Sequence, residues 1–208
     1  ASSLHPILAS KGTEAIHILL PDDRGGLVPS AAKLLIDNWA GYDAMLVGPG
    51  MGREAKTVEF LLTLLRAGGE SPVQRLGFVQ GNDAVPMEDE ARPRHLVVDA
   101  DALNILADVD EWWSLLPNRS VLTPHPGEMA RLTGTTAQEV QARRIDAAVD
   151  AALKWGHVVV LKGAHSVVAA PDGTATISPF ANPGLATAGT GDVLAGAIVG
   201  LLAQGVDP

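Results

Sequence analysis

Short apolar runs alternate along the chain with longer segments in which apolar residues recur every three or four positions. The runs are typical of buried β-strands, and the longer segments are typical of amphipathic helices. Residues 166–170 and 174–177 flank Pro171-Asp172-Gly173, which predicts a hairpin. Further strands are expected at residues 15–20, 44–47, 96–98, 121–123 and 158–161.

Alternation of helices with uninterrupted apolar strands predicts an α/β fold, in which a mostly parallel central sheet carries helices on both faces. In such folds ligands bind at the carboxyl ends of the strands. No internal repeat divides the chain, and residues 81–94 are expected to form a polar surface connection within a single domain of residues 1–208. Helices are expected at residues 30–39, with Ser30 as N-cap, and at 56–65, 102–106, 128–132, 137–155 and 193–203.

Composition excludes several kinds of site and partner. The formal net charge is −9 and no basic stripe is visible, which argues against nucleic acid as a partner. The chain contains no cysteine, so disulfides, thiolate metal sites and a cysteine nucleophile are excluded, and a cytoplasmic location is expected. No apolar run approaches the roughly 20 residues that cross a bilayer, so no membrane partner is expected. A phosphate-bearing ligand is compatible with the acidic charge, because backbone amides can bind it.

The segment 182–192 is the strongest candidate site. Gly189 and Gly191 flank Thr190, so the backbone there can approach an anion closely. Exposed amides at the start of the following helix, together with the helix dipole, favour a phosphoryl group. Asp192 opens this helix, where a carboxylate can take a proton from a hydroxyl that attacks phosphorus. The alternative is a glycine-rich turn in which Asp192 only caps the helix.

Two other strand ends carry candidate polar groups. Lys162 follows the expected strand 158–161 and can hold nucleotide ribose or phosphate, or can be a solvated lysine at a tight turn. His125 stands between two prolines, which restrict the backbone and are expected to aim the ring into the cleft. There the ring can hydrogen-bond a substrate or move a proton, unless it is only a turn residue. Glu128 is expected to start the next helix.

Glycines and carboxylates mark the remaining strand ends. Three spaced glycines follow the strand at 44–47 and allow a ligand to approach the backbone, although a plain strand-to-helix turn has the same composition. The spacing is not G-x-G-x-x-G, so it does not favour a Rossmann dinucleotide site. Asp99 ends a strand, Asp101 is expected to cap the next helix, and either can contact Mg²⁺ through water.

Taken in order, these motifs resemble the ADP/ATP-dependent NAD(P)H-hydrate dehydratase family, the carboxy-terminal domain type of the YjeF proteins. The resemblance covers nearly all of the chain from about residue 15 onward. The related sugar and vitamin kinases share the GTGD element but usually not the whole run around it. The matching runs are VGPGMGR, VVDADALNIL, LTPHPGEMARL, VVLKGAHSVV and NPGLATAGTGDVLAGAIVGLLAQG.

The resemblance implies a ribokinase-like fold and the conversion of NADHX or NADPHX, hydrated at C6 of the nicotinamide ring, to NADH or NADPH. The co-substrate would be ADP, or ATP in eukaryotic members, with Mg²⁺ as the expected ion and a homo-oligomer as the expected assembly. ADP would yield AMP and phosphate. The residues implied to bind the adenine nucleotide are Lys162, Gly163, Ala164, His165, Ser166, Asn182 and Gly191. Those implied to bind the hydrated nicotinamide are Gly50, Gly52, His125 and Asp192.

The residues fit a chemistry in which Asp192 deprotonates the C6 hydroxyl, which then attacks the terminal phosphorus of ADP. Ring nitrogen electrons would afterwards expel phosphate. Backbone amides of an anion hole would stabilise the transferring phosphoryl group, and its members are Ala188, Gly189, Thr190 and Gly191. The rival hypotheses are a ribokinase-like kinase of a vitamin precursor, which would release a stable phosphoester, and a nucleotide-binding domain without catalysis.

Two departures from the family's pattern are noted. Members usually begin with a further strand, helix and strand and continue beyond the last helix, so the chain is expected to lack its first strand-helix-strand and its C-terminal end. Ala188 stands where many members carry glycine, which the anion site should tolerate if Ala188 has a negative φ.

Overall fold

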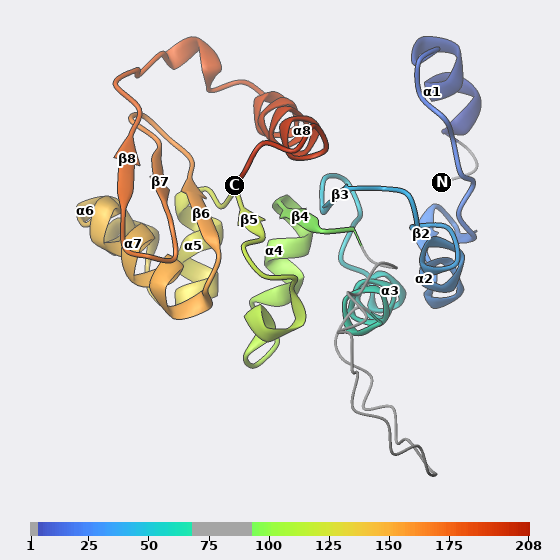
Figure 1. The fold of residues 1–208 in the computed structure, drawn as a ribbon, viewed down its shortest axis with the longest axis horizontal. Coiled ribbons are helices and arrows are strands. Elements are labelled where there is room, and N and C mark those ends of the chain that lie inside the picture. The colour runs from blue at the N-terminus through green and yellow to red at the C-terminus, as the bar shows by residue number, and fades with distance from the viewer. Residues whose placement is uncertain (1–3, 68–92) are drawn as a thin grey trace, which may run out of the picture.

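A six-stranded sheet with the order β3-β4-β5-β6-β7-β8 forms the centre of the protein (Figure 1). The computed structural model describes residues 4–67 and 93–208. The strands β7 (Val167–Ala169) and β8 (Ala175–Ile177) form an antiparallel hairpin, as predicted. The other four strands run parallel, which confirms the mostly parallel sheet; they are β3 (Ala44–Val47), β4 (His95–Val98), β5 (Val121–Leu122) and β6 (Val158–Leu161).

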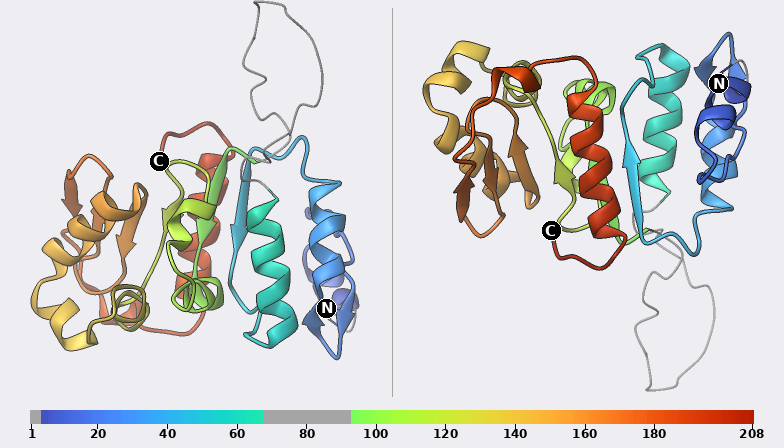
Figure 2. Two further views of the ribbon diagram at one scale, coloured as in Figure 1. Left: turned by 90° about the horizontal axis from the view of Figure 1, so that it is seen from below. Right: turned by 90° about the horizontal axis from the view of Figure 1, so that it is seen from above.

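Helices cover both faces of this sheet, which also confirms the prediction (Figure 2). One face carries α3 (Ala55–Arg66), α4 (Ala100–Leu106), α5 (Pro126–Thr133) and α7 (Arg144–Trp155). The opposite face carries α8 (Thr190–Leu202), which packs on β3 and β4. Strand residues alternate between the two layers: in β4, Leu96 and Val98 join the larger core, whereas Val97 packs in the cluster that includes α8.

The other elements flank or connect this frame. No helix in the described part of the chain is long and apolar enough to cross a membrane. Helix α2 (Pro29–Ile36) packs on α3 at the β3 side of the sheet. The short elements are α1 (His5–Lys11), β1 (Asp22–Asp23), β2 (Gly26–Leu27), η1 (Trp112–Leu115), α6 (Ala137–Ala142) and η2 (Pro183–Leu185).

The strand predicted at residues 15–20 is wrong. These residues have no regular structure, and Ile16 is 89% exposed. An apolar run becomes a strand only where a neighbouring strand pairs with its backbone, and neither described sheet pairs with this segment. The connection predicted at residues 81–94 lies almost entirely outside the described residues.

Several helix boundaries also differ from prediction; α8, for example, begins at Thr190 and not at residue 193. The helix expected from residue 30 begins at Pro29 with Val28 at its N-cap, so Ser30 lies inside it. Proline suits the first helical position because its fixed φ is already helical and its missing N–H is not needed there. The helix expected at 137–155 is two helices, because Arg143 has φ −135° and ψ 46° and interrupts the hydrogen-bond ladder.

The carboxyl ends of the parallel strands are tied together by backbone hydrogen bonds between successive turns. The Asp99 amide donates to Val47, and the Thr123 amide donates to Val98, each at 3.1 Å. The Lys162 amide donates to the Pro124 carbonyl at 2.9 Å. Residues that are far apart in sequence therefore meet at one edge of the sheet, as the fold class requires.

Burial lowers the pKa of His157 below the usual value of 6.5, and a hydrogen bond to Trp113 opposes this effect. The Nε2 atom donates to the Trp113 carbonyl at 2.9 Å, while Nδ1 is buried without a partner in the described part of the chain. The unfolded chain therefore takes up a proton more readily than the folded chain. We expect the free energy of unfolding to be greatest above pH 6.5 and to decrease as the pH falls below it.

Urea unfolding at neutral and mildly acidic pH measures this effect. The His157→Gln variant can donate the same hydrogen bond but cannot titrate, so its stability should decrease less on acidification. Equal losses for the natural protein and the variant would show that His157 makes no such contribution.

Candidate active site

The first turn of α8 presents two amides that have no partner in the described part of the chain, together with an exposed carboxylate. Gly189 is the N-cap with φ +89°, a conformation that glycine adopts without strain. The Thr190 hydroxyl lies 2.8 Å from the carbonyl oxygens of Leu185 and Thr187 and closes the turn. Asp192 is the third helical residue; it is exposed and makes no hydrogen bond or ion pair with any described residue. Asp192 therefore does not cap α8. The Thr190 amide donates to the Thr187 carbonyl at 3.4 Å, whereas the amides of Gly191 and Asp192 have no partner among the described residues and are available to an anion.

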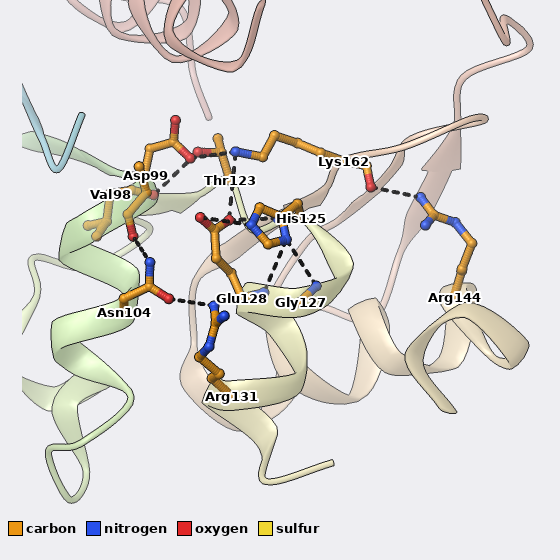
Figure 3. A network of polar contacts seen from close by, with 11 residues as sticks. Val98, Asp99, Asn104, Thr123, His125, Gly127, Glu128, Arg131, Arg144 and Lys162 are labelled. Carbon is orange, nitrogen blue, oxygen red and sulfur yellow. Dashed lines mark hydrogen bonds and ion pairs between the residues drawn. The ribbon is translucent and has the colours of Figure 1, made fainter. Parts of the chain in front are cut away.

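The Lys162 side chain, which follows β6, contacts carboxylates that follow β4 and β5 (Figure 3). Its Nζ lies 2.6 Å from Oδ1 of Asp99 and 3.8 Å from Oε2 of Glu128. The Lys162 side chain is 18% exposed, while those of Asp99 and Glu128 are 1% and 5% exposed. A Cβ added to Gly191 would lie 3.5 Å from this Nζ, so the ammonium also borders the first turn of α8. Lys162 is thus not a solvated turn lysine.

Arg144 holds the turn that carries Lys162. Its Nη2 donates to the carbonyl oxygens of Leu161 at 3.0 Å and Lys162 at 3.3 Å (Figure 3). Gly163 has φ +146°, a conformation that strains other residues, and an added Cβ would lie 3.0 Å from the guanidinium, so the Arg144 side chain would have to shift. Partial burial lowers the pKa of Arg144, which nevertheless stays protonated because arginine titrates far above neutrality.

His125 folds back over its own helix. Its Nδ1 accepts from the amides of Gly127 at 3.0 Å and Glu128 at 3.2 Å, and Oε2 of Glu128 accepts from the His125 amide at 2.8 Å. This reciprocal pair is a capping box. The neutral ring therefore carries its proton on Nε2, which lies 3.3 Å from Oε1 of Glu128. The ring is half exposed, so a role in substrate binding stays a prediction. Glu128 is the third residue of α5, not its first as predicted.

The glycine turn after β3 is linked to the start of α4. The Gly52 amide donates to Oδ2 of Asp101 at 2.9 Å. The prediction that Asp101 caps α4 is therefore wrong, because Asp99 occupies the N-cap position and Asp101 lies inside the helix, turned to Gly52. Gly50 has φ +65°, and nothing lies within 4 Å of an added Cβ, so its backbone is open to a ligand.

A cavity of about 440 Å³ lies beside the turn at residues 163–166, where nucleotide binding is predicted. Ala164 and His165 line it together with the α6–α7 junction and the β7–β8 hairpin. His165 has φ +55°, and its Nδ1 donates to the Ser178 carbonyl at 3.1 Å, while its Nε2 makes no hydrogen bond to the residues that the structure describes. A larger cavity of about 530 Å³ lies among α5, α6 and α7, but it contains none of the predicted site residues.

Two predicted residues, Asn182 and Ser166, have hydrogen-bond partners other than Lys162, Asp99 and Glu128. Asn182 is exposed and its Oδ1 accepts from the Gly184 amide at 2.9 Å, so the side chain caps η2. The Ser166 hydroxyl donates to the Gly163 carbonyl at 3.0 Å. Ala188 is not among the described non-glycine residues with positive φ, which meets the condition stated for its tolerance in the anion hole.

Among the described residues, no group of three or more His, Asp or Glu side chains is placed to hold a metal ion. Asp99 faces the Lys162 ammonium and Asp101 accepts the Gly52 amide, so both predicted contacts of Mg²⁺ already have partners. These residues do not fit a metal site of the protein's own. Mg²⁺ bound by nucleotide phosphates needs few protein carboxylates, and no step below passes through it.

Sequence reasoning missed the roles of Glu128 and Arg144. The spacing of Glu128, three residues after His125, matches a capping box and could have indicated that its carboxylate turns back towards His125. Arg144 gave no signal, because its contacts depend on the break at Arg143 and on the packing of α7 beside β6.

The fold defines a ribokinase-like α/β protein. A crystal structure of ADP/ATP-dependent NAD(P)H-hydrate dehydratase from Bacillus subtilis, co-crystallised with ATP and Mg²⁺ and soaked with CoA, has a TM-score of 0.67 and 28% identity to the chain. The match covers 97% of this chain and 60% of that chain. A ribokinase-like superfamily protein from Enterococcus faecalis V583 has a TM-score of 0.68 and 25% identity, over 96% of this chain and 58% of that chain.

The chain belongs to the NAD(P)H-hydrate dehydratase family, whose profile matches residues 8–208. The bifunctional NAD(P)H-hydrate repair enzyme Nnr of Moorella thermoacetica is 43% identical over 203 residues, which are 97% of this chain and 34% of that protein. The ADP-dependent (S)-NAD(P)H-hydrate dehydratase of Neisseria meningitidis serogroup B is 49% identical over 119 residues, 56% of this chain and 40% of that protein. The chain thus spans about a third of the length of the bifunctional relatives. The predicted family and fold are confirmed.

Proposed function

We propose that the protein catalyses the ADP-dependent dehydration of NADHX and NADPHX to NADH and NADPH, with release of AMP and phosphate. The observation that carries this proposal is the first turn of α8. It presents available amides and the exposed carboxylate of Asp192, and its Gly191 borders the Lys162 ammonium. Family membership and the names of the relatives support the choice of substrate.

The chemistry follows from leaving-group ability. Hydroxide is a poor leaving group, whereas phosphate is a good one. Asp192 takes the proton of the C6 hydroxyl. At the same time the oxygen of that hydroxyl bonds to the terminal phosphorus of ADP, and AMP departs. The amides of residues 188–191 stabilise charge on the transferring group. The electron pair of the ring nitrogen then expels phosphate from C6, and the neighbouring ring carbon loses a proton to restore the dihydropyridine.

The two substrates would occupy opposite sides of α8's first turn. ADP would lie on the β6 side, along residues 162–166 and the cavity beside them. The hydrated nicotinamide would lie on the β3 side, where Gly50 and Gly52 expose backbone and His125 presents its half-exposed ring. Mg²⁺ would accompany the ADP phosphates. A homo-oligomer is the expectation of the resemblance alone, and a cytoplasmic location is that of the absence of cysteine.

Incubation of the protein with NADHX, ADP and Mg²⁺, followed by the absorbance of NADH, tests the proposed function. NADH should appear only when the nucleotide is present, and AMP and phosphate should form in equal amounts with it. Formation of a stable phosphoester from a vitamin precursor, with no NADH from NADHX, would favour the kinase. Binding of ADP without turnover of either substrate would favour a non-catalytic domain.

A further inference from the structure

We infer that Lys162 is a catalytic residue that contacts the transferring phosphoryl group, and that Asp99 and Glu128 are positioning residues that hold its ammonium. This inference rests on the proposed function and adds a specific cation to it. An ammonium group has three N–H donors. Asp99 takes one at 2.6 Å and Glu128 lies near a second at 3.8 Å. One donor is left, and a Cβ added to Gly191 of the proposed anion hole would lie 3.5 Å from Nζ.

Burial decides which charge an incoming phosphoryl group would meet. The Asp99 and Glu128 side chains are almost completely covered, whereas Lys162 keeps part of its surface. The anion would therefore contact the ammonium and the α8 amides, because both carboxylates are covered. Figure 3 shows Asp99 beside the ammonium and Glu128 below it. The carboxylates also have other partners that fix them, since Glu128 accepts the His125 amide.

The backbone of Lys162 is held as firmly as its side chain. Its amide donates to Pro124, and its carbonyl accepts from Arg144. Little reorganisation is then needed when negative charge develops on the phosphoryl oxygens, which is the condition under which a fixed cation lowers a barrier most. Lys162 neither gives nor takes a proton in this proposal, so the step forms and breaks the same bonds as described above.

The Lys162→Met variant tests the catalytic role. We expect kcat to fall about 100- to 1000-fold, as for other single donors to a transition-state anion, while KM for ADP changes no more than about threefold. Lys33→Met, which removes an exposed lysine of α2, is the matched control and should keep full activity. Thermal unfolding shows whether each variant is folded, and in Lys162→Ala added ethylammonium should restore part of kcat. An unchanged kcat, or a loss confined to KM, would overturn the catalytic role.

A double-mutant cycle tests the positioning role. Asp99→Asn should lower kcat with little change in KM for ADP, because a displaced ammonium still binds ADP but meets the transition state poorly. Combining Asp99→Asn with Lys162→Met should cost no more than Lys162→Met alone, since Asp99 acts through Lys162. Additive losses in kcat would overturn this role for Asp99.

Binding of a phosphoryl mimic separates this inference from the proposed function. Calorimetry would compare the affinity for AMP alone with that for AMP plus aluminium fluoride, which imitates a transferring phosphoryl group. Aluminium fluoride should tighten the binding of AMP to the natural protein and to Lys33→Met, but not to Lys162→Met. The protein could fail to turn over NADHX while aluminium fluoride still tightens AMP binding only where Lys162 is present. In that case the proposed function fails and the role of Lys162 stands. If turnover is normal and fluoride tightens binding equally in all three proteins, the inference is wrong.

Discussion

Replacement of Asp192 by asparagine is expected to lower turnover of NADHX by about three to four orders of magnitude, the upper range for removal of a general base. Asparagine keeps the shape of the side chain but cannot accept the hydroxyl proton. The position makes this a clean test, because Asp192 is exposed and has no partner in the described part of the chain. Affinity for ADP should change no more than about threefold, because ADP is held by other groups.

Asp110→Asn is the matched control for this variant. It removes an exposed carboxylate that follows α4, away from the carboxyl edge of the sheet, and should leave turnover unchanged. Calorimetric titration with ADP and the NADH absorbance assay measure both quantities. Turnover of Asp192→Asn close to that of the natural protein would reject Asp192 as the base.

Replacement of Gly48 by alanine is expected to cost the largest amount of stability. Gly48 has φ +126°, and an added Cβ would lie only 1.7 Å from the Asp99 carbonyl oxygen, which is part of the backbone. The turns after β3 and β4 would have to separate, although the Asp99 amide bonds to Val47 there. Backbone strain and overpacking together should lower the free energy of unfolding by about 3–5 kcal/mol.

Gly50→Ala isolates the backbone contribution in the same turn. Gly50 also has positive φ, at +65°, but an added Cβ meets nothing within 4 Å. Its cost should be about 1–2 kcal/mol, the strain of the left-handed conformation alone. Urea unfolding of both variants gives the comparison. If both variants lost the same free energy of unfolding, the close approach of Gly48 to Asp99 would not contribute to the cost of Gly48→Ala.

The parallel strands could be predicted because each is a continuous apolar run that both helix layers bury. The hairpin was predictable because a Pro-Asp-Gly turn lies between its strands. The segment at residues 15–20 shows the limit of this reasoning, since its apolar residues resemble a strand but nothing pairs with them. The break at Arg143 was also not predictable, because arginine favours helices and the interruption depends on tertiary contacts of the next residue, Arg144.

Part of the candidate site could likewise be predicted from the sequence, and part could not. The glycine-rich turn and Asp192 form one contiguous motif, and their chemistry can be read from neighbouring residues. The contact between Lys162 and Asp99 joins residues 63 positions apart, so only the strand order brings them together. His125 shows the reverse case: its prolines predicted a ring aimed into the cleft, whereas the ring nitrogen is used to cap α5.

The fate of the C6 oxygen tests the proposed chemistry most directly. NADHX prepared in water enriched in a heavy oxygen isotope carries the label on its C6 hydroxyl. If that hydroxyl attacks phosphorus, the labelled oxygen leaves in phosphate, and mass spectrometry of the released phosphate should find one labelled atom per molecule. Unlabelled phosphate, with the heavy isotope released into water, would contradict the transfer of a phosphoryl group to the substrate.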